Sequence, residues 1–410
     1  MRIIVLNADY PRFLAWFYRS QPALENAPYA TQMAARNGSL FGLADFYSRN
    51  FAALGHVAAE IHVNNPYLQS AWAREHGMKV GAAIPHGQAR QHRLPGWLQR
   101  AAAPFKPVLR PLVRKVGLSP RLDAASEQIL LAQIEAFKPD VVLNQDIFYV
   151  DAPLMRRIAG IGRPIVIGQV GVEPSRGTDW SVYDLMLSQL PRIVQSIRNT
   201  GVRAEVSHLA FEPHLLDALP PAPSQDVDIS FVGSVSADHQ QRIALLEAVA
   251  RRYDLKLWGN LPRSLPSSSP LQRCFQGEVW GAEMYQTLQH SKITLNSHID
   301  IAGREAGNMR LFEATGAGAF LLTDFKDNLH TLFEPDREVA VWRGVDDCLE
   351  TIDRFLGDAS GRAAIAQAGH ARTMAQHTYR HRASELLALI EELQAGKRDL
   401  PRSKSVSRGS

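Results

Sequence analysis

The sequence predicts an α/β protein with two domains, each built on an open parallel sheet. Three observations support this class. Short apolar runs with the length of buried strands alternate with helix-like segments, which is typical of parallel sheets covered by helices. A proline-rich stretch at 219–224 interrupts the alternation, which then starts again. With 410 residues, the chain is also long enough to bury two cores.

The first half contains five apolar runs that predict strands. A helix is predicted over 40–54, where Gly55 ends the segment, and another over 126–137, where Pro139 follows. The predicted strands cover 3–6, 58–63, 141–144, 164–168 and 185–188.

The second half repeats this pattern. Its first strand is followed by a loop of small residues at 233–236, and a last helix is predicted over 382–394. Two successive open sheets of this kind predict two Rossmann-like domains that face each other across a cleft. The predicted strands cover 227–232, 255–258, 293–296, 319–323 and 338–342, and the helices 239–253, 282–290, 346–356 and 361–377.

These elements suggest a division of the chain into domains. Residues 1–218 form a predicted N-terminal domain on the acceptor side, 219–226 a linker, and 227–378 a C-terminal domain that binds the donor. The helix within 379–395 is expected to pack back across the cleft. Residues 396–410 are polar and basic, which predicts a disordered tail.

A basic insertion at 77–122 breaks the alternation. It contains nine Lys and Arg residues, no Asp or Glu, and apolar side chains such as Trp97 and Phe105 between the charges. A segment of this composition can lie on an anionic membrane surface, although an irregular insertion with a solvated charged face is the simpler interpretation. Nucleic-acid binding is not predicted, because no nucleic-acid-binding motif accompanies the charge.

The whole chain has the composition of a globular protein, with a net charge of +4. Its two cysteines, Cys274 and Cys348, lie in different segments, which indicates a reduced compartment without a disulfide framework. The apolar run near the N-terminus is too short for a signal peptide, and no run approaches a membrane span. We therefore expect a cytoplasmic protein, with membrane contact, if it occurs, on the inner face.

The stretch 303–324 carries the clearest chemical signal. It reads as a loop, a helix that begins at Asn308, a glycine stop and a buried strand. The first backbone amides of such a helix are free to bind an anion. Glu313 lies more than one turn into the helix, in reach of a ribose diol, and Glu305 lies in the preceding loop, in reach of a sugar hydroxyl. The alternative is a capped surface helix with two solvated glutamates. The predicted donor-binding residues of this stretch are Gly307, Asn308, Met309, Arg310 and Glu313.

The same stretch resembles a known family. Asn308-x-Arg-Leu-Phe-Glu-Ala-x-Gly-x-Gly followed by Phe-Leu-Leu-Thr-Asp324 is similar to glycosyltransferases related to the spore-maturation protein CgeB, as is the segment from Gly361 to Arg382. The resemblance is best over 227–392. It implies the two-domain GT-B fold, a retaining reaction, and a donor whose ribose meets Glu313 and whose sugar meets Glu305. The Pro-Phe-Gly that usually follows the first glutamate is replaced here by Ala-Gly-Asn.

Other candidates lie at predicted strand ends, where open sheets bind ligands. Gly233 and Ser234 follow a strand and precede a helix, where backbone can approach a phosphate. Arg242, early in that helix, is placed to neutralise a diphosphate, and Asn296 ends a neighbouring strand. The alternative is a tight turn with a surface arginine. In the first domain, Asp146 and Glu173 are the candidates for a catalytic base, although a retaining mechanism needs none.

The sequence therefore predicts an enzyme, a glycosyltransferase that moves a sugar from a nucleotide-diphosphate-sugar to an unidentified glycan, lipid-linked or protein acceptor. No cofactor or metal is expected, because the only Asp-x-Asp, at 226–228, begins a core strand and no metal-binding or serine-hydrolase motif is present. Two alternatives remain. One is a nucleotide-sugar epimerase of the same fold, and the other is a non-catalytic nucleotide-binding or scaffold protein.

Overall fold

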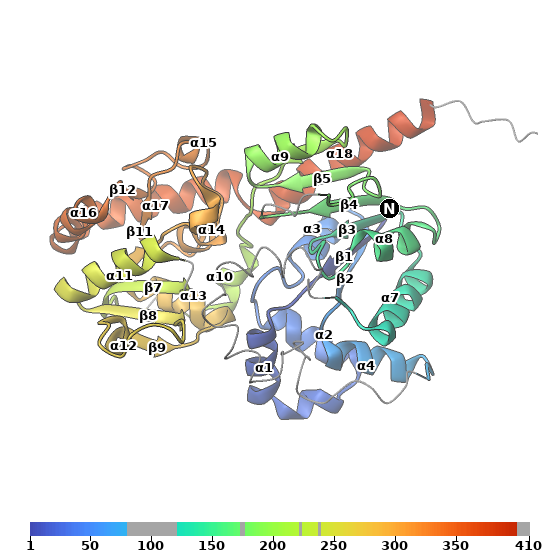
Figure 1. Ribbon diagram of the computed structural model, residues 1–410, viewed down its shortest axis with the longest axis horizontal. Coiled ribbons are helices and arrows are strands. Elements are labelled where there is room, and N and C mark those ends of the chain that lie inside the picture. The colour runs from blue at the N-terminus through green and yellow to red at the C-terminus, as the bar shows by residue number, and fades with distance from the viewer. Residues whose placement is uncertain (80–120, 173–176, 221–223, 237–238, 400–410) are drawn as a thin grey trace, which may run out of the picture.

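Two parallel six-stranded sheets form the centres of two domains that lie side by side (Figure 1). The structure, a computed structural model, describes residues 1–79, 121–172, 177–220, 224–236 and 239–399. The predicted α/β class with two parallel sheets is confirmed. Most of the basic insertion, 80–120, and the last residues of the tail, 400–410, lie outside the described residues, and the predicted domain bounds stay a prediction.

The first sheet has the strand order β2-β1-β3-β4-β5-β6. Successive strands along the chain move first to one side of β1 and then to the other, so the order reverses between β1 and β3. The strands are β1 (Arg2–Asn7), β2 (Val57–His62), β3 (Val141–Asn144), β4 (Ile165–Gln169), β5 (Leu185–Ser188) and β6 (Ala204–Val206).

The second sheet has the strand order β12-β11-β10-β7-β8-β9, and its order reverses between β7 and β10. Its central strands β10 and β11 and the middle of β7 are largely buried, which explains why they appear in the sequence as short apolar runs. They are β7 (Val227–Ser234), β8 (Leu255–Asn260), β9 (Phe275–Gly277), β10 (Ser291–Leu295), β11 (Leu321–Asp324) and β12 (Ala340–Trp342).

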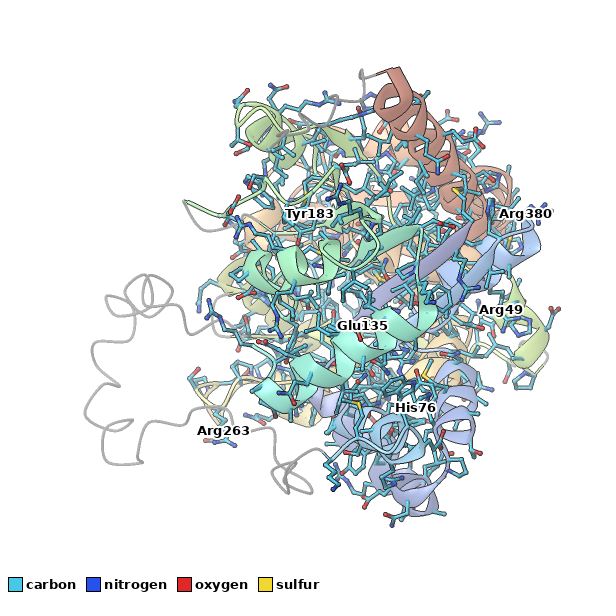
Figure 2. All side chains as sticks on the ribbon, turned by 90° about the vertical axis from the view of Figure 1, so that its right-hand side faces the viewer. Arg49, His76, Glu135, Tyr183, Arg263 and Arg380 are labelled. Atoms are coloured by element: carbon cyan, nitrogen blue, oxygen red, sulfur yellow. The ribbon has the colours of Figure 1, made fainter. Side chains whose placement is uncertain are left out.

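Helices cover both sheets, and several of them were not predicted. Figure 2 looks onto α7, whose exposed Glu135 points to solvent. In the first domain the helices are α1 (Pro11–Ser20), η1 (Pro22–Asn26), α2 (Tyr29–Gly38), α3 (Phe46–Ala53), α4 (Pro66–Glu75), α7 (Ala124–Phe137), α8 (Ala152–Ala159), α9 (Pro191–Arg198) and α10 (His214–Ala218). In the second they are α11 (Gln240–Arg252), α12 (Leu271–Cys274), α13 (Gly281–Gln289), η3 (Asp300–Ala302), α14 (Met309–Gly316), α15 (Leu329–Leu332), α16 (Val345–Gly357), α17 (Ala359–Gln376) and α18 (Tyr379–Asp399).

Two predicted boundaries are wrong. The helix predicted over 40–54 begins only at Phe46, because Leu40 and Ala44 have φ values of 56° and 37°, which a helix does not allow. The loop predicted at 233–236 begins too early, because Gly233 and Ser234 still belong to β7. Gly233 pairs with Gly259 of β8, and a Cβ on Gly259 would lie 2.0 Å from the Gly233 carbonyl oxygen. Only glycine therefore fits at position 259.

The chain crosses between the domains twice, and the two crossings hydrogen-bond to each other. The Phe211 amide donates to the His377 carbonyl (2.8 Å), and the Tyr379 amide donates to the Phe211 carbonyl (3.0 Å). From there α18 runs over the first domain (Figure 1), where it contacts α3 and where Glu392 pairs with Arg203 at 2.5 Å. The helix continues to Asp399, so the tail does not begin at 396 as predicted.

A buried glutamate makes the first domain sensitive to pH. Glu60 on β2 is 4% exposed, and its carboxyl oxygens accept from the Ser48 amide (3.1 Å) and contact the Asn7 side-chain amide (2.5 Å). Burial raises the pKa of Glu60 to about 8, although these hydrogen bonds lower it in part. Asn7 Oδ1 has no partner among the described residues. With its amide rotated, Asn7 would accept a hydrogen bond from protonated Glu60, and 2.5 Å is typical of an O–H···O contact.

We expect Glu60→Gln to remove part of the loss of stability at alkaline pH. The folded-state pKa lies above the ordinary value of 4.5, so the folded chain binds the extra proton. This proton contributes on the order of 2–4 kcal/mol to the free energy of unfolding. The contribution is fully present below about pH 4.5 and is lost as the pH rises toward 8. Glutamine can donate to Asn7 Oδ1 and accept from Ser48 without titrating. The difference between the melting temperatures at pH 5 and pH 8 should therefore be smaller in the variant than in the wild type. An equal difference would contradict the raised pKa of Glu60.

Candidate functional site

In the second sheet, the strand order reverses beside the loops that the sequence singles out. Open α/β sheets bind ligands outside the carboxyl ends of their strands at such a reversal. Here β7 ends at Ser234 and β10 at Leu295, and the two strands are neighbours. Asn296, Ser297 and His298 follow β10 directly. The reversal therefore places the two candidate segments of the donor domain next to each other.

Arg242 connects these two segments. It comes from the first turn of α11, is 6% exposed, and its guanidinium donates to the Ser234 carbonyl (2.6 Å) and to the Ser297 carbonyl. Its guanidinium carbon Cζ lies over the ring of Phe231, 5.5 Å from the ring centre. Burial lowers the pKa of Arg242, and the negative charges of Asp324 and Asp300 oppose this. The side chain thus fixes the backbone around the reversal and adds positive charge there.

A polar network fixes the loop that precedes α14. The side-chain amides of Asn296 and Asn308 bond to each other, with Asn308 Nδ2 donating to Asn296 Oδ1 at 2.8 Å. His298 lies 4% exposed between this loop and β11. Its Nε2 accepts from the Gly307 amide (3.3 Å), and its Nδ1 lies 2.7 Å from Asp324 Oδ1. The side chains at the ends of β10 and β11 therefore hold the residues before α14 in place.

Asp324 keeps its charge in this buried position. Burial raises the pKa of its carboxyl group, but the hydrogen bonds from His298 and the positive charge of Lys326 outweigh burial and lower the pKa to about 2. The carboxylate also accepts from the His298 amide at 2.9 Å, and Lys326 Nζ lies 3.2 Å from it. Asp324 is not among the site residues predicted from the sequence. Its position as an acidic residue at the end of a strand is the signal that could have identified it.

The N-terminus of α14 leaves backbone donors unused. Asn308 occupies the position before the helix, but its side chain makes no capping hydrogen bond because it is engaged with Asn296. No hydrogen bond to the amides of Met309 or Arg310 is found among the described residues. The first turn of this helix therefore offers unpaired amides, and the anion site predicted from the sequence depends on these donors.

Glu313 and Arg310 form an ion pair on α14. Arg310 Nη1 lies 2.9 Å from Glu313 Oε2, and the two side chains are 13% and 8% exposed. The Nε of Arg310 is buried without a hydrogen-bond partner among the described residues. An unused guanidinium donor beside a carboxylate and two free amides is suited to a diphosphate that is attached to a hydroxyl-bearing group.

Glu305 makes a contact that the sequence did not predict. Its Oε1 accepts from the Arg192 amide at the start of α9 (3.0 Å), and its Oε2 lies 3.3 Å from Arg192 Nε. Next to it, Gly307 has a φ of +156°, and a Cβ there would lie 3.0 Å from Cγ of Gln189. The loop before α14 therefore touches the first domain. No sequence signal identifies Arg192 or Gln189, because the contact joins residues more than 100 positions apart.

Of the first-domain candidates, Asp146 lies at the reversal between β1 and β3. One of its carboxyl oxygens accepts from the amides of Phe148 (2.9 Å) and Tyr149 (3.0 Å), and burial raises its pKa despite these bonds. Tyr10 follows β1 and Asp146 follows β3, so the two residues leave neighbouring strands at the same edge of the sheet. Glu173 lies outside the described residues.

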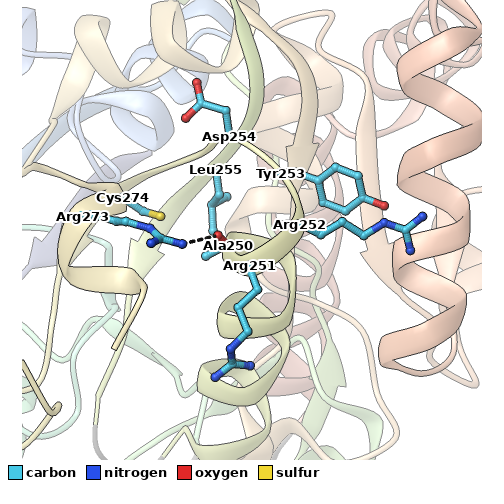
Figure 3. Close-up of a pocket in the computed structure, with 8 residues that line it drawn as sticks. All are labelled: Ala250, Arg251, Arg252, Tyr253, Asp254, Leu255, Arg273 and Cys274. Atoms are coloured by element: carbon cyan, nitrogen blue, oxygen red, sulfur yellow. Dashed lines mark hydrogen bonds between the residues drawn. The ribbon is translucent and has the colours of Figure 1, made fainter. Parts of the chain in front are cut away.

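A separate cavity of about 340 Å³ lies away from these residues (Figure 3). Its lining comes from the end of α11, the start of β8 and α12, at the edge of the sheet opposite to the strand ends described above. Its arginines are already engaged: Arg251 pairs with Glu247, Arg252 pairs with Asp353, and Arg273 donates to the Ala250 carbonyl at 3.2 Å. This cavity is therefore not the donor site.

Within the described ranges, no group of three or more His, Cys, Asp or Glu side chains is placed to hold a metal ion. None of the helices in the described part of the chain combines the length and the apolar character that a membrane span needs. Both cysteines are buried free thiols.

Comparisons with known proteins support the predicted fold. Residues 241–388 match the family described as glycosyl transferase-like. No curated protein sequence matches the chain. Among solved structures, similar folds include a glycosyltransferase from Rickettsia africae, with 10% identity, a TM-score of 0.58, and coverage of 96% of this chain and 98% of that one.

Two further structures show the same fold along their whole length. Sucrose-phosphate synthase from Thermosynechococcus elongatus has 12% identity and a TM-score of 0.55, with 97% of this chain and 100% of that chain covered. HepE from Anabaena, solved in complex with UDP-glucose, has 10% identity and a TM-score of 0.54, with 96% and 100% covered. The chain therefore has the GT-B architecture, and its residues 241–388 match a glycosyl transferase-like family.

Proposed function

We propose that the protein transfers a sugar from a nucleotide-diphosphate-sugar to an acceptor hydroxyl, with retention of configuration and without a metal ion. The observation that carries this proposal is the start of α14, where two free amides, an unused guanidinium donor and the carboxylate of Glu313 lie together. The amides and Arg310 supply positive charge to a departing diphosphate. Glu313 is placed to accept from ribose hydroxyls. HepE, whose structure contains UDP-glucose, supports this class of donor.

Finer assignments belong to the same proposal. We propose that the chain is a relative of CgeB, and the motif at 308–324 supports this. Glu305 is the residue that would contact the donor sugar, and because it is bound to Arg192 here, it would have to exchange this contact for the sugar. The location we propose is cytoplasmic, with peripheral membrane contact through the basic insertion at 77–122.

The first test is the melting temperature with and without millimolar UDP, GDP, dTDP and CMP. A ligand present at about 100 times its dissociation constant stabilises the folded chain by about 2.7 kcal/mol, which gives a measurable shift. We expect one nucleotide diphosphate to raise the melting temperature, and the same nucleotide to be released when its sugar conjugate turns over. No shift with any of the four would contradict the donor site. A shift without turnover across many acceptors would favour a binding protein.

A further inference from the structure

An exposed tyrosine marks the first domain at the reversal of its sheet. Tyr10 follows β1 and precedes α1, and its side chain is 65% exposed. β1 and β3 are paired neighbours, so Tyr10 and Asp146 leave adjacent strands at the same edge. The residues around Tyr10 reach the second domain, because Arg12 pairs with Glu278 and the ring of Phe41 lies 4.7 Å from that of Trp280. The tyrosine therefore lies at the boundary between the domains.

Hydrogen bonds and an ion pair hold the loop that carries the exposed Tyr10 in place. The preceding residue, Asp9, exchanges two hydrogen bonds of 2.8 Å with the side chain of Asn64. Its buried carboxylate lies 2.6 Å from Arg36 Nη2, which is also buried. The Tyr10 carbonyl accepts a hydrogen bond from the Leu14 amide (3.0 Å). The centres of the Tyr10 and Phe41 rings lie 6.0 Å apart. The loop thus holds an aromatic face toward solvent, as a binding surface requires.

The polar side chains at the carboxyl ends of β3, β4 and β5, at the same edge of the sheet as Tyr10, include amides and a carboxylate. Gln145 donates to Gln169 at the ends of β3 and β4 (3.1 Å), and the Oε1 of Gln145 is buried without a partner among the described residues. Gln189, after β5, donates to the Gly171 carbonyl (3.3 Å). Asp146 leaves β3 at the same edge of the sheet as Tyr10. Amide and carboxyl groups beside an aromatic face suit a ligand with many hydroxyl groups.

The same surroundings disfavour a charged ligand. In the part of the first domain that the structure describes, the arginines near this edge are already paired: Arg12 with Glu278, Arg36 with Asp9, and Arg192 with Glu305. Asp146, which leaves a neighbouring strand at this edge, carries a negative charge. A phosphate or carboxylate on a ligand at Tyr10 would be repelled by Asp146 and would find these arginines of the first domain already paired.

We propose that the acceptor is a neutral saccharide whose ring stacks on Tyr10 while its hydroxyls bond to Asp146 and to the glutamine amides. This inference rests on the proposed function and names its acceptor class. The weakly positive C–H edge of a sugar ring is attracted to the negative face of the aromatic ring. In the transfer, an acceptor hydroxyl oxygen bonds to the anomeric carbon of the donor. The bond from that carbon to the diphosphate breaks with its electron pair, and the hydroxyl proton passes to the diphosphate.

The test uses the full-length protein on an array of neutral, phosphorylated, sulfated and carboxylated oligosaccharides, with the stabilising nucleotide present. The variants are Tyr10→Ala and Tyr10→Phe. Phe275→Ala serves as a control because Phe275 is also an exposed aromatic (37%) but begins β9, at the amino end of its strand. We expect binding of neutral saccharides, weakened about tenfold by Tyr10→Ala, with Tyr10→Phe and Phe275→Ala close to the wild type. The affinity for the nucleotide should be unchanged in all three.

Preferential binding of phosphorylated or carboxylated saccharides would overturn the inference, as would unchanged affinity in Tyr10→Ala. Nucleotide binding without binding of any neutral saccharide would overturn it too, while leaving the proposed function intact. Absence of the nucleotide-induced melting shift would instead contradict the proposed function. The two failures are therefore distinguished by two separate measurements on the same protein.

Discussion

Replacing Glu313 with alanine is expected to abolish stabilisation by the nucleotide diphosphate and to lower sugar transfer by at least about 100-fold. The carboxylate is 6% exposed and paired with Arg310 at the start of α14, beside the free amides that we assign to the diphosphate. A hydrogen bond to a charged group contributes about 1.5–3 kcal/mol, and a ribose diol offers two. Their loss, together with the altered position of Arg310, gives the expected magnitude.

The measurement is the increase in melting temperature that the nucleotide causes in each variant. The melting temperatures of the nucleotide-free variants are not compared directly, because removal of a buried charge lowers them in any case. Glu313→Gln keeps the shape of the side chain and should show a smaller nucleotide shift than the wild type. Glu350→Ala, an exposed glutamate on α16, should behave like the wild type. A full nucleotide shift in Glu313→Ala would show that the donor binds elsewhere.

The sequence predicts those parts of the donor domain whose determinants are local. The short helix α14, its start after Asn308 and the strand that follows are set by a helix-starting residue, two glycines and an apolar run, all within 303–324. The free amides of its first turn follow from the geometry of any helix start. The pattern of buried parallel strands likewise follows from apolar runs, because both faces of such sheets are covered.

Contacts between segments distant in the sequence were not predictable in this way. Glu305 was expected to face a donor sugar, but it accepts from the amide of Arg192, 113 positions away. Arg242 was expected at the diphosphate, but two of its donors bind the backbone of Ser234 and Ser297. In both cases the residue type was informative, while its partner depends on how two sheets and their loops come together. The position at which β7 ends, Ser234, likewise depends on the pairing of this strand with β8.

Arg242→Ala is expected to destabilise the chain by about 2–4 kcal/mol and to weaken nucleotide binding strongly. The variant leaves the carbonyls of Ser234 and Ser297 without these buried donors and opens a hole beside Phe231. It also removes a positive charge that lies near Asp324. Because these carbonyls belong to the two segments beside the strand reversal, their backbone should become free to move. The phosphate-binding geometry would then be lost even though no residue of α14 has changed.

Arg251→Ala tests whether this effect depends on position. Arg251 lies on the same helix, but its side chain is 62% exposed and pairs with Glu247 one turn away, so its loss should cost less than about 0.5 kcal/mol. Arg242→Lys keeps the charge, but a single ammonium group lacks the planar fork that reaches both carbonyls. It should therefore recover only part of the stability in urea denaturation. If Arg242→Ala were as stable as Arg251→Ala and still bound the nucleotide, then Arg242 would not organise the site, and the positioning of the two loops would have to come from the pair formed by Asn296 and Asn308.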